Sequence, residues 1–247
     1  LPRQQMDIYR PRIDQGKPPV VFVYGGAWRA GTKKDFKFIG HALTQLGHAV
    51  IIPDYQLFPQ VKFPVFVEDV AKAIKATELR SDVLLGRPLD EFVLMGHSAG
   101  AHIAALLTVD KSYLSGVGLD VCRDVAGFAG LAGPYDFNPP SRGKYAKIFP
   151  VELREKSKPI NFKPGRFPPI LLLHGDVDRT VRPGHSQRFR ARLKRAGADV
   201  DLKIYRNVGH VGIIGAYSTI VPTKARTVED VSTFIRRHQN VRGNTCS

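Results

Sequence analysis

One pentapeptide near the middle of the chain has the residue types of a catalytic nucleophile. It reads Gly96-His97-Ser98-Ala99-Gly100 and lies between an apolar run, residues 92–95, and a helical pattern, residues 101–107. A serine on a sharp strand-to-helix turn needs small flanking residues, because the backbone is strained and neighbouring elements crowd it. The N–H groups that begin the following helix favour an oxyanion. We therefore predict that Ser98 is a nucleophile; the alternative is a glycine-rich turn with an inert serine.

A serine nucleophile also needs a base and a carboxylate that orients the base. Where the nucleophilic serine lies on a strand-to-helix turn of this type, the acid and the base follow it along the chain in the order Ser, Asp or Glu, then His. Asp176 and Asp178 come just after the apolar run 170–173, and both suit the orienting acid. His210 follows the run 200–205 in a glycine-containing loop. We predict that His210 is the base, and these residues alone leave the acid open between Asp176 and Asp178.

An early loop has the composition of an oxyanion hole. The apolar run 20–24 ends in Gly25 and Gly26, followed by Ala27. Glycines let backbone N–H groups approach a developing negative charge closely. A simple turn would also use paired glycines, but together with Ser98 the pair favours an oxyanion loop.

The elements that must position these residues alternate along the chain. Short apolar runs bounded by turn residues alternate with helical patterns, which is typical of an α/β fold with a mainly parallel central sheet and helices on both faces. We expect one domain over residues 1–247, interrupted by a proline-rich, lid-like excursion at 133–169. The predicted strands are 6–9, 20–24, 49–53, 92–95, 125–129, 170–174 and 200–205, and the clearest helical faces are those of Phe36, Ile39, Leu43 and Leu46, of Val67, Val70, Ala71 and Ile74, and of Val228, Val231, Phe234 and Ile235.

The chain is strongly basic, with a net charge of +15 and a pI near 10.0. A basic total binds anions only where the charges gather on one face. In residues 185–195 the basic side chains point in several directions, and Phe189, Leu193 and Ala196 form a narrow apolar stripe. That pattern is typical of a solvated surface helix. We expect no nucleic-acid partner, and the purpose of the charge stays open. No apolar run approaches the ~20 residues that span a bilayer, so we expect no transmembrane segment.

The cysteines and remaining histidines do not suggest a metal site. Cys122 and Cys246 are too few and too badly spaced for a metal cluster or a disulfide framework. A single bridge stays possible, but we favour unpaired cysteines because we expect the tail at 242–245 to fray. Packing around the turn explains His97 and His102. Four further histidines lack Cys, Asp or Glu at ligand spacing: His41, His48, His185 and His238.

Taken together, these motifs resemble a known group of proteins. The resemblance is to small bacterial esterases of the α/β-hydrolase superfamily related to hormone-sensitive lipase, feruloyl and acetylxylan esterases, and kynurenine formamidase. It runs over most of the chain, and the order and spacing of the motifs are specific. The shared residues are Asp7-Ile8-Tyr9-Arg10-Pro11, Tyr24-Gly25-Gly26-Ala27-Trp28, Pro53-Asp54-Tyr55, Phe63-Pro64 with Asp69, Gly96 to Gly100, Gly133-Pro134-Tyr135-Asp136-Phe137, His174-Gly175 with Asp178, and Gly209-His210.

The resemblance implies roles for individual residues. It selects Asp178 as the acid, because Asp178 is the third residue after Gly175 in the pattern His-Gly-x-x-Asp. It makes the backbone N–H groups of Gly26, Ala27 and Ala99 the oxyanion donors. Tyr24 replaces the histidine that usually opens His-Gly-Gly, and Ala27 replaces the third glycine of the lipase-like relatives. Since backbone groups act at Gly26 and Ala27, the predicted oxyanion hole survives both changes.

The resemblance also implies an activity. We expect a serine carboxylesterase that cleaves short acetyl-type or feruloyl-type esters through an acyl-enzyme, without a cofactor. Only a short segment precedes Tyr24, so we expect no N-terminal cap, any lid to come from residues 133–169, and an open, shallow site. An arylformamidase would use the same groups, and a non-catalytic binding module would share the fold. The sequence leaves acyl and alcohol preference and oligomeric state open; because it starts at Leu1, we expect residues upstream of it, and the compartment is also open.

Overall fold

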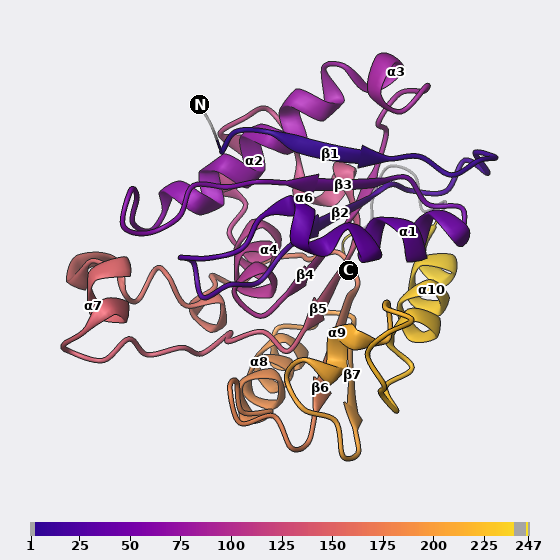
Figure 1. Ribbon diagram of the computed structural model, residues 1–247. Helices are drawn as coiled ribbons and strands as arrows, with labels where there is room; N and C mark the ends of the chain where they lie inside the picture. The colour runs from indigo at the N-terminus through magenta and orange to yellow at the C-terminus, as the bar shows by residue number, and fades with distance from the viewer. Residues whose placement is uncertain (1–2, 240–245, 247) are drawn as a thin grey trace.

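A central β-sheet runs through the protein. The computed structural model describes residues 3–239 and Cys246. These residues form a seven-stranded sheet with the order β1-β3-β2-β4-β5-β6-β7 (Figure 1). The strands are β1 (Met6–Tyr9), β2 (Val20–Val23), β3 (Val50–Pro53), β4 (Phe92–His97), β5 (Val125–Leu131), β6 (Ile170–Gly175) and β7 (Val200–Tyr205).

The sheet is mainly parallel, as predicted. Only β1 runs antiparallel, pairing with β3 at one edge, while each remaining neighbouring pair is parallel. The side chains of β2, β3, β4, β5 and β6 are all buried, as expected for strands covered on both faces. In the edge strand β7 only Val200 is buried, and the other side chains are half-buried or exposed. Because the strands from β3 to β7 in the sheet order run in the same direction, their carboxyl ends lie at one rim of the sheet.

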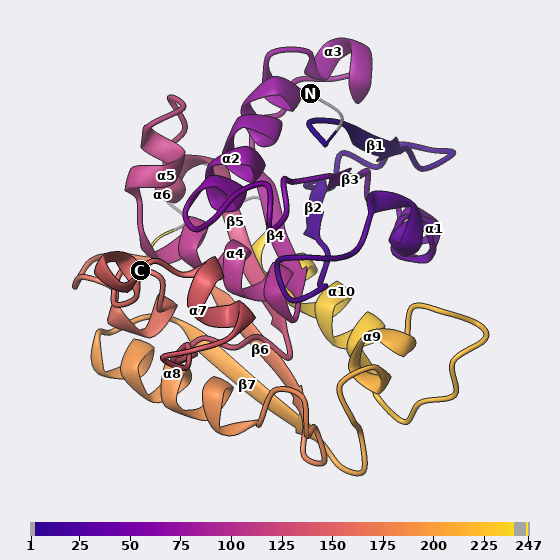
Figure 2. The same ribbon diagram turned by 60° about the vertical axis from the view of Figure 1, so that its left-hand side comes forward.

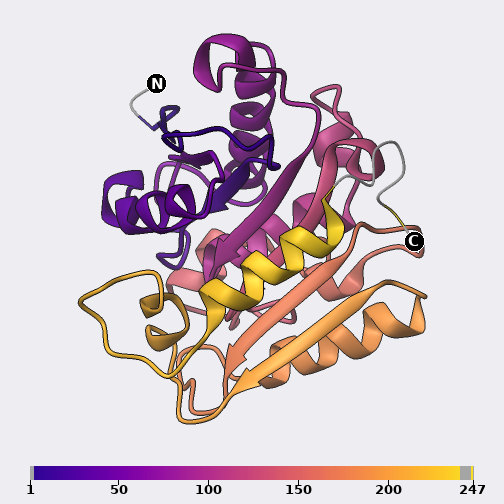
Figure 3. The same ribbon diagram turned by 90° about the vertical axis from the view of Figure 1, so that its right-hand side faces the viewer.

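Helices cover both faces of this sheet. The views agree that α1 and α10 lie on one face and α2, α4 and α8 on the other (Figures 1 and 3). The apolar faces predicted for α1, α2 and α10 are buried at Ile39 and Leu43, at Val67, Val70 and Ile74, and at Val231 and Phe234. The helices are α1 (Lys37–Gln45), α2 (Val65–Glu78), α3 (Ser81–Leu84), α4 (Ala99–Val109), α5 (Ser112–Ser115), α6 (Val121–Asp124), α7 (Lys144–Ile148), α8 (Gly184–Arg195), α9 (Gly212–Gly215) and α10 (Thr227–His238), with 3₁₀ turns η1 (Lys33–Phe36), η2 (Val151–Leu153) and η3 (Pro159–Asn161).

Three strands extend further than predicted, β6 by one residue to Gly175 and two others by two residues. β4 continues to His97 and β5 to Leu131, since these two residues still pair in the parallel ladder. The predicted ends at residues 95 and 129 stopped where the apolar run stops, and hydrogen bonding to a neighbouring strand carries both beyond it. The extension places Ser98 directly at the end of β4.

The excursion at residues 133–169 contains α7, η2 and η3 and no strand. Figure 2 shows it in front of the sheet, between α4 and α8, and η3 contacts both helices. Its main anchor is Phe149, which is fully buried and packs edge-on against Trp28, with ring centroids 4.8 Å apart. Phe149 also lies 5.9 Å from the ring of Phe63. The excursion thus packs behind the loop that carries Gly26 and Ala27.

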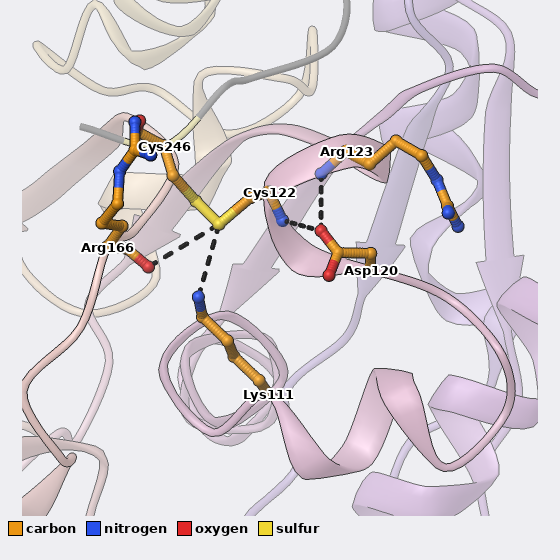
Figure 4. The surroundings of a disulfide bond; sticks show 6 residues. All are labelled: Lys111, Asp120, Cys122, Arg123, Arg166 and Cys246. Atoms are coloured by element: carbon orange, nitrogen blue, oxygen red, sulfur yellow. Dashed lines mark hydrogen bonds between the residues drawn. A yellow bond between two sulfur atoms is a disulfide. The ribbon is translucent and has the colours of Figure 1, made fainter.

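A disulfide joins Cys122 in α6 to Cys246 (Figure 4). The prediction that favoured unpaired cysteines is therefore wrong. The two residues are 124 positions apart, and the fold brings their Cα atoms to 5.0 Å. The residues expected to fray, 242–245, lie outside the described part of the chain. Along the described ranges, no helix combines the length and hydropathy needed to cross a membrane.

Candidate active site

Ser98 occupies a tight turn between β4 and α4. Its φ is 55° and its ψ −121°, a strained conformation for a residue with a side chain. The neighbouring glycines are required by close packing: a Cβ on Gly96 would come within 2.4 Å of the Gly100 carbonyl oxygen, and one on Gly100 within 2.0 Å of the Val23 oxygen. Ser98 is partly exposed, whereas α4 behind it is buried along its whole length. The turn therefore presents one hydroxyl group at the rim of the sheet.

A hydrogen-bonded chain links the predicted acid, base and nucleophile. His210 Nε2 lies 2.9 Å from Ser98 Oγ, and His210 Nδ1 lies 2.7 Å from Asp178 Oδ2. With Nδ1–H donating to the carboxylate, Nε2 is left to accept the serine proton. The three residues come from the ends of β4, β6 and β7, so strands far apart in sequence bring them together.

Asp178 is held as a buried carboxylate. Its side chain is inaccessible to solvent, and Oδ1 accepts hydrogen bonds from the N–H groups of Thr180 and Val181, both at 2.9 Å. Burial alone raises the pKa of a carboxyl group. Hydrogen bonds from His174, His210 and Val181 outweigh burial and hold the pKa of Asp178 well below its usual value. Asp178 therefore stays ionised and can stabilise a protonated His210.

Asp176, the other acid considered, makes a different contact. Its Oδ1 accepts a hydrogen bond of 2.7 Å from the backbone N–H of Asn207, whose φ is +58°. Asp176 is exposed, and it joins the loop after β6 to the loop that leads to His210. The geometry thus pairs His210 with Asp178 and gives Asp176 a part in shaping the His210 loop.

His174 has a place in the site for which sequence reasoning gave no role. It is fully buried at the end of β6, where Nε2–H donates to the Val181 carbonyl at 2.8 Å and Nδ1 accepts from Ser186 Oγ at 2.7 Å. The same Nε2 is 3.4 Å from Asp178 Oδ2. His174 therefore fixes both ends of the turn that carries Asp178. The available signal was a histidine at the end of an otherwise apolar run.

The loop after β2 lies directly against the serine. A Cβ on Gly25 would come within 3.0 Å of Ser98 Cβ, and Gly26, with φ +135°, would place a Cβ 1.9 Å from the Ala30 oxygen. Ala27 follows with φ +53°. Among the described residues, no acceptor takes a hydrogen bond from the backbone N–H groups of Gly26, Ala27 or Ala99. These groups are available to an oxygen atom beside Ser98.

Tyr24 supports this loop in place of the usual histidine. It is buried, its hydroxyl donates to Asp54 Oδ1 at 2.8 Å, and its carbonyl accepts from the Tyr55 hydroxyl at 2.8 Å. The backbone N–H of Lys33 donates to the same Asp54 oxygen, also at 2.8 Å. Burial, together with the hydrogen bond to Asp54, raises the pKa of Tyr24 far above its usual value, so the phenol stays a donor.

His97 and His102, which flank the serine, each hydrogen bond to a backbone carbonyl. His97 Nε2–H donates to the carbonyl of His210 at 3.1 Å, and His102 Nε2–H donates to that of Ser157 at 2.6 Å. Burial lowers the pKa of His97 to about 3, with a further contribution from His210, and lowers that of His102 to about 4. Both rings are therefore neutral. The sequence explained His97 by packing alone and did not predict its hydrogen bond to the His210 carbonyl.

A pocket of about 630 Å³ opens over the serine. Gly26, Ala27, Ser98 and His210 line it, and part of its wall comes from residues 211–221, which include α9. The excursion at 133–169, expected to supply any lid, contributes none of the lining residues. The apolar part of the wall consists of Phe36, Phe38, Val211, Ile214 and Val221. Across residues 3–239 and Cys246, no three His, Cys, Asp or Glu side chains group closely enough to hold a metal ion.

Comparison with known sequences finds esterases and a formamidase. The chain is 31% identical over 255 residues to a probable isoprenylcysteine alpha-carbonyl methylesterase of Oryza sativa subsp. japonica, covering 95% of this chain and 61% of that protein. It is 27% identical to the esterase LipQ of Mycobacterium tuberculosis, covering 78% and 50%, and 26% identical to the kynurenine formamidase of Danio rerio, covering 85% and 72%. The chain spans about half to three-fifths of the length of the plant methylesterases it matches.

Solved structures share the fold. A truncated carbohydrate esterase from gut microbiota superposes with a TM-score of 0.80 at 23% identity, covering 96% of this chain and 92% of that one. Esterase Est2 of Thermogutta terrifontis, with butyrate bound, gives 0.76 at 19% identity, covering 96% and 91%. Among family models, BD-FAE matches residues 6–126 and that of the prolyl oligopeptidase family matches residues 68–240. The chain therefore belongs to the prolyl oligopeptidase family, and its sheet has the α/β-hydrolase fold.

Proposed function

We propose that this protein is a serine carboxylesterase in which Ser98, His210 and Asp178 form the catalytic triad. The observation that carries the proposal is the continuous chain from Ser98 Oγ through His210 to Asp178, with links of 2.9 and 2.7 Å. These are the hydrogen bonds by which a base activates a serine and a carboxylate orients the base. The esterase names of the relatives support the same reaction class.

The first half-reaction forms an acyl-enzyme. His210 Nε2 takes the proton of Ser98 Oγ as that oxygen bonds to the ester carbonyl carbon, while Asp178 stabilises the imidazolium. The carbonyl oxygen becomes an oxyanion, which the backbone N–H groups of Gly26, Ala27 and Ala99 stabilise, each by about 3 kcal/mol. The tetrahedral intermediate then collapses: the bond to the alcohol oxygen breaks, and His210 returns the proton to that oxygen.

The second half-reaction uses the same groups on water. His210 removes a proton from a water molecule that attacks the acyl carbonyl carbon, and the same backbone N–H groups donate hydrogen bonds to the new oxyanion. Collapse breaks the bond to Ser98 Oγ, which regains its proton from His210. The products are the alcohol and the carboxylic acid, and no step in this sequence needs a cofactor.

The pocket supports a substrate with one short and one larger part. Its volume of about 630 Å³ exceeds what an acetyl group fills and lies within the usual range of ligand pockets, about 300–1,000 Å³. We propose that an acetyl-type acyl group lies between Ser98 and the oxyanion loop, with the alcohol against the apolar wall. A feruloyl-type acyl group would place its ring on the same wall, near Phe36 and Phe38.

A second candidate is hydrolysis of an aryl formamide. The relative named kynurenine formamidase matches over 85% of this chain and 72% of its own length. The triad and the oxyanion donors would act on a formamide in the same way, with His210 protonating an amine instead of an alcohol. Turnover of N-formylkynurenine side by side with simple acetate esters separates the two candidates, because the preferred leaving group shows the larger kcat/KM.

The direct test is Ser98→Ala with p-nitrophenyl acetate. We expect kcat/KM to fall by at least about 10⁴-fold, since the nucleophile is lost. Ser115→Ala is the matched control: Ser115 is an exposed serine of α5 outside the pocket, and its variant should keep full activity. Circular dichroism checks that both variants fold. Retained activity in Ser98→Ala would contradict the proposal, and failure of the parent protein to react with a fluorophosphonate probe would favour a non-catalytic binding module.

A further inference from the structure

A second pocket lies away from Ser98. It has a volume of about 640 Å³ and shares no lining residue with the pocket over the serine. Its walls come from the end of α4, the start of α5 and residues 153–167 of the excursion. Apolar side chains form its buried part, among them Phe63, Leu106, Phe162 and Phe167.

Four lysines line this apolar pocket. Lys111, Lys156 and Lys163 are exposed, and Lys158 is half-buried. Lys158 is paired with Glu155 at 2.7 Å. No carboxylate in the described ranges comes within ion-pair distance of the other three lysines. One acidic residue, Asp110, also lines the pocket, and its Oδ1 accepts hydrogen bonds from the backbone N–H and the hydroxyl of Ser112. The rim is therefore positive above an apolar interior.

The surrounding segment concentrates the charge of the chain. Residues 153–167, which form one wall of the pocket, contain five basic and one acidic side chain, a net charge of +4 out of +15 for the whole sequence. Arg192 of α8 adds a further cation: its guanidinium carbon lies 4.7 Å above the ring of Phe162, which lines the pocket. The basic excess that the sequence left unexplained thus gathers in part around this pocket.

The disulfide anchors two walls of the pocket. The Lys111 ammonium lies 3.4 Å from Cys122 Sγ, and the backbone carbonyl of Arg166 approaches the same sulfur at 3.8 Å (Figure 4). The Arg166 guanidinium donates to the carbonyl of Cys246 at 2.6 Å. The bond between Cys122 and Cys246 therefore holds Lys111 and the segment around Arg166 close together, so the pocket is a built feature of the fold.

We propose that this pocket binds an organic carboxylate with an apolar chain or ring, such as a free fatty acid. The apolar part lies against Phe63, Phe162 and Phe167, where burial removes it from water. The carboxylate lies at the rim, where Lys156 and Lys163 have no competing carboxylate. An uncharged molecule of the same shape would gain only the burial of its apolar part and no contact with the lysines. Charge complementarity therefore favours binding of the anion.

The experiment is a titration of the ¹⁵N-labelled protein with octanoate and, separately, with 1-octanol, followed by amide chemical shifts. We expect octanoate to shift amides of residues 106–113 and 153–167 and to bind more tightly than 1-octanol. Lys156→Gln/Lys163→Gln should weaken octanoate binding about tenfold, because each solvent-exposed charge contact contributes roughly a factor of three. Added salt should weaken it as well, through screening.

The matched control is Lys144→Gln/Lys147→Gln. It removes two exposed lysines from the same excursion and changes the net charge equally, but neither residue lines the pocket. It should bind octanoate like the parent protein. Equal affinity for 1-octanol, equal loss in both double variants, or shifts confined to residues 25–38 and 211–221 would overturn the proposal. So would lysine-dependent binding of phosphatidylglycerol vesicles without any binding of free octanoate, because the ligand would then be a lipid surface.

Because the readout is binding rather than turnover, the result does not depend on the proposed esterase activity. Loss of activity in Ser98→Ala tests the triad alone, whereas the shifts of residues 106–113 and 153–167 test this pocket alone. Either proposal can therefore fail while the other stands.

Discussion

We predict that the free energy of unfolding falls as the pH is lowered from 7 to 5, because two buried histidines beside Ser98 are neutral in the folded protein. In the folded protein the pKa of His97 is about 3 and that of His102 about 4, because both rings are buried. In the unfolded chain both titrate near 6.5. A lowered histidine pKa means that the unfolded state binds more protons below pH 6.5, so acid favours unfolding. The stability is fully present above pH 6.5 and is lost as the pH falls toward the folded pKa values.

The size of the loss follows from these values. A difference of one pH unit between a group's pKa and the solution corresponds to about 1.4 kcal/mol. Between pH 7 and pH 5 an unfolded histidine becomes protonated, while the buried ones stay neutral, and this stabilises the unfolded state by the equivalent of about 1.4 pH units for each histidine. Each histidine therefore contributes about 2 kcal/mol, and the pair about 4 kcal/mol. Domains are typically stable by about 5–15 kcal/mol, so this loss is a large share of the total. Buried His48, whose pKa is also lowered by burial, acts in the same direction.

Urea unfolding at pH 7 and at pH 5, followed by circular dichroism, measures this loss. The variant His102→Gln, whose amide can still donate to the Ser157 carbonyl, should reduce the difference between the two pH values by about 2 kcal/mol. His41→Gln, which changes an exposed histidine, should leave the difference unchanged. A parent protein whose unfolding free energy differs by less than about 1 kcal/mol between the two pH values would refute the reasoning. So would an unchanged difference in His102→Gln.

Three further predictions concern single contacts. Cys122→Ser/Cys246→Ser should lower the unfolding free energy by up to about 5 kcal/mol, because the bond closes a loop of 124 positions; thermal unfolding with and without reductant checks this. Tyr24→Phe should cost about 2 kcal/mol in urea unfolding through the lost hydrogen bond to the Asp54 carboxylate, and an unchanged midpoint would count against it. His97→Asn should lower kcat by about tenfold and change KM little, because the loop of His210 loses its 3.1 Å anchor; steady-state kinetics that show only a KM effect would contradict a positioning role.

The sequence predicted the fold class well because hydrophobic patterning reports burial on both faces of a sheet. All seven expected strands exist, and Met6–Tyr9 and Val200–Tyr205 have the expected bounds. The ends at His97 and Leu131 escaped prediction, since they depend on pairing between strands and not on composition. The meeting of Ser98, Asp178 and His210 could be anticipated for a related reason. Parallel strands have their carboxyl ends at one rim of the sheet, so residues just after different strands lie close together.

The contacts that escaped prediction depend on segments meeting in space. Cys122 and Cys246 lie 124 positions apart, and no local pattern shows that the chain end returns to α6. The clamp that His174 makes on the Val181 carbonyl needs the backbone path of the turn after β6. Likewise, residues 211–221 carry no motif, and their position at the pocket follows from the contact of α9 with β6 and from the hydrogen bond of Thr227, at the start of α10, to the Ile213 carbonyl. Local patterns predict elements, whereas these contacts follow from how the elements pack.

The wall of the pocket and the proposed base belong to one continuous piece of chain. Val211 follows His210 directly, and α9 is tied back by Thr223 Oγ1 to the Gly212 carbonyl at 2.8 Å and by Thr227 Oγ1 to the Ile213 carbonyl at 3.0 Å. A bulky substrate that pushes this wall outward therefore pulls on the backbone that carries the imidazole. Substitutions that widen the pocket at this segment would therefore also shift His210, and with it the proton transfer proposed for this residue. Phe36 and Phe38 also line the pocket but belong to a separate piece of chain, so substitutions there would change its width without acting directly on the segment attached to His210.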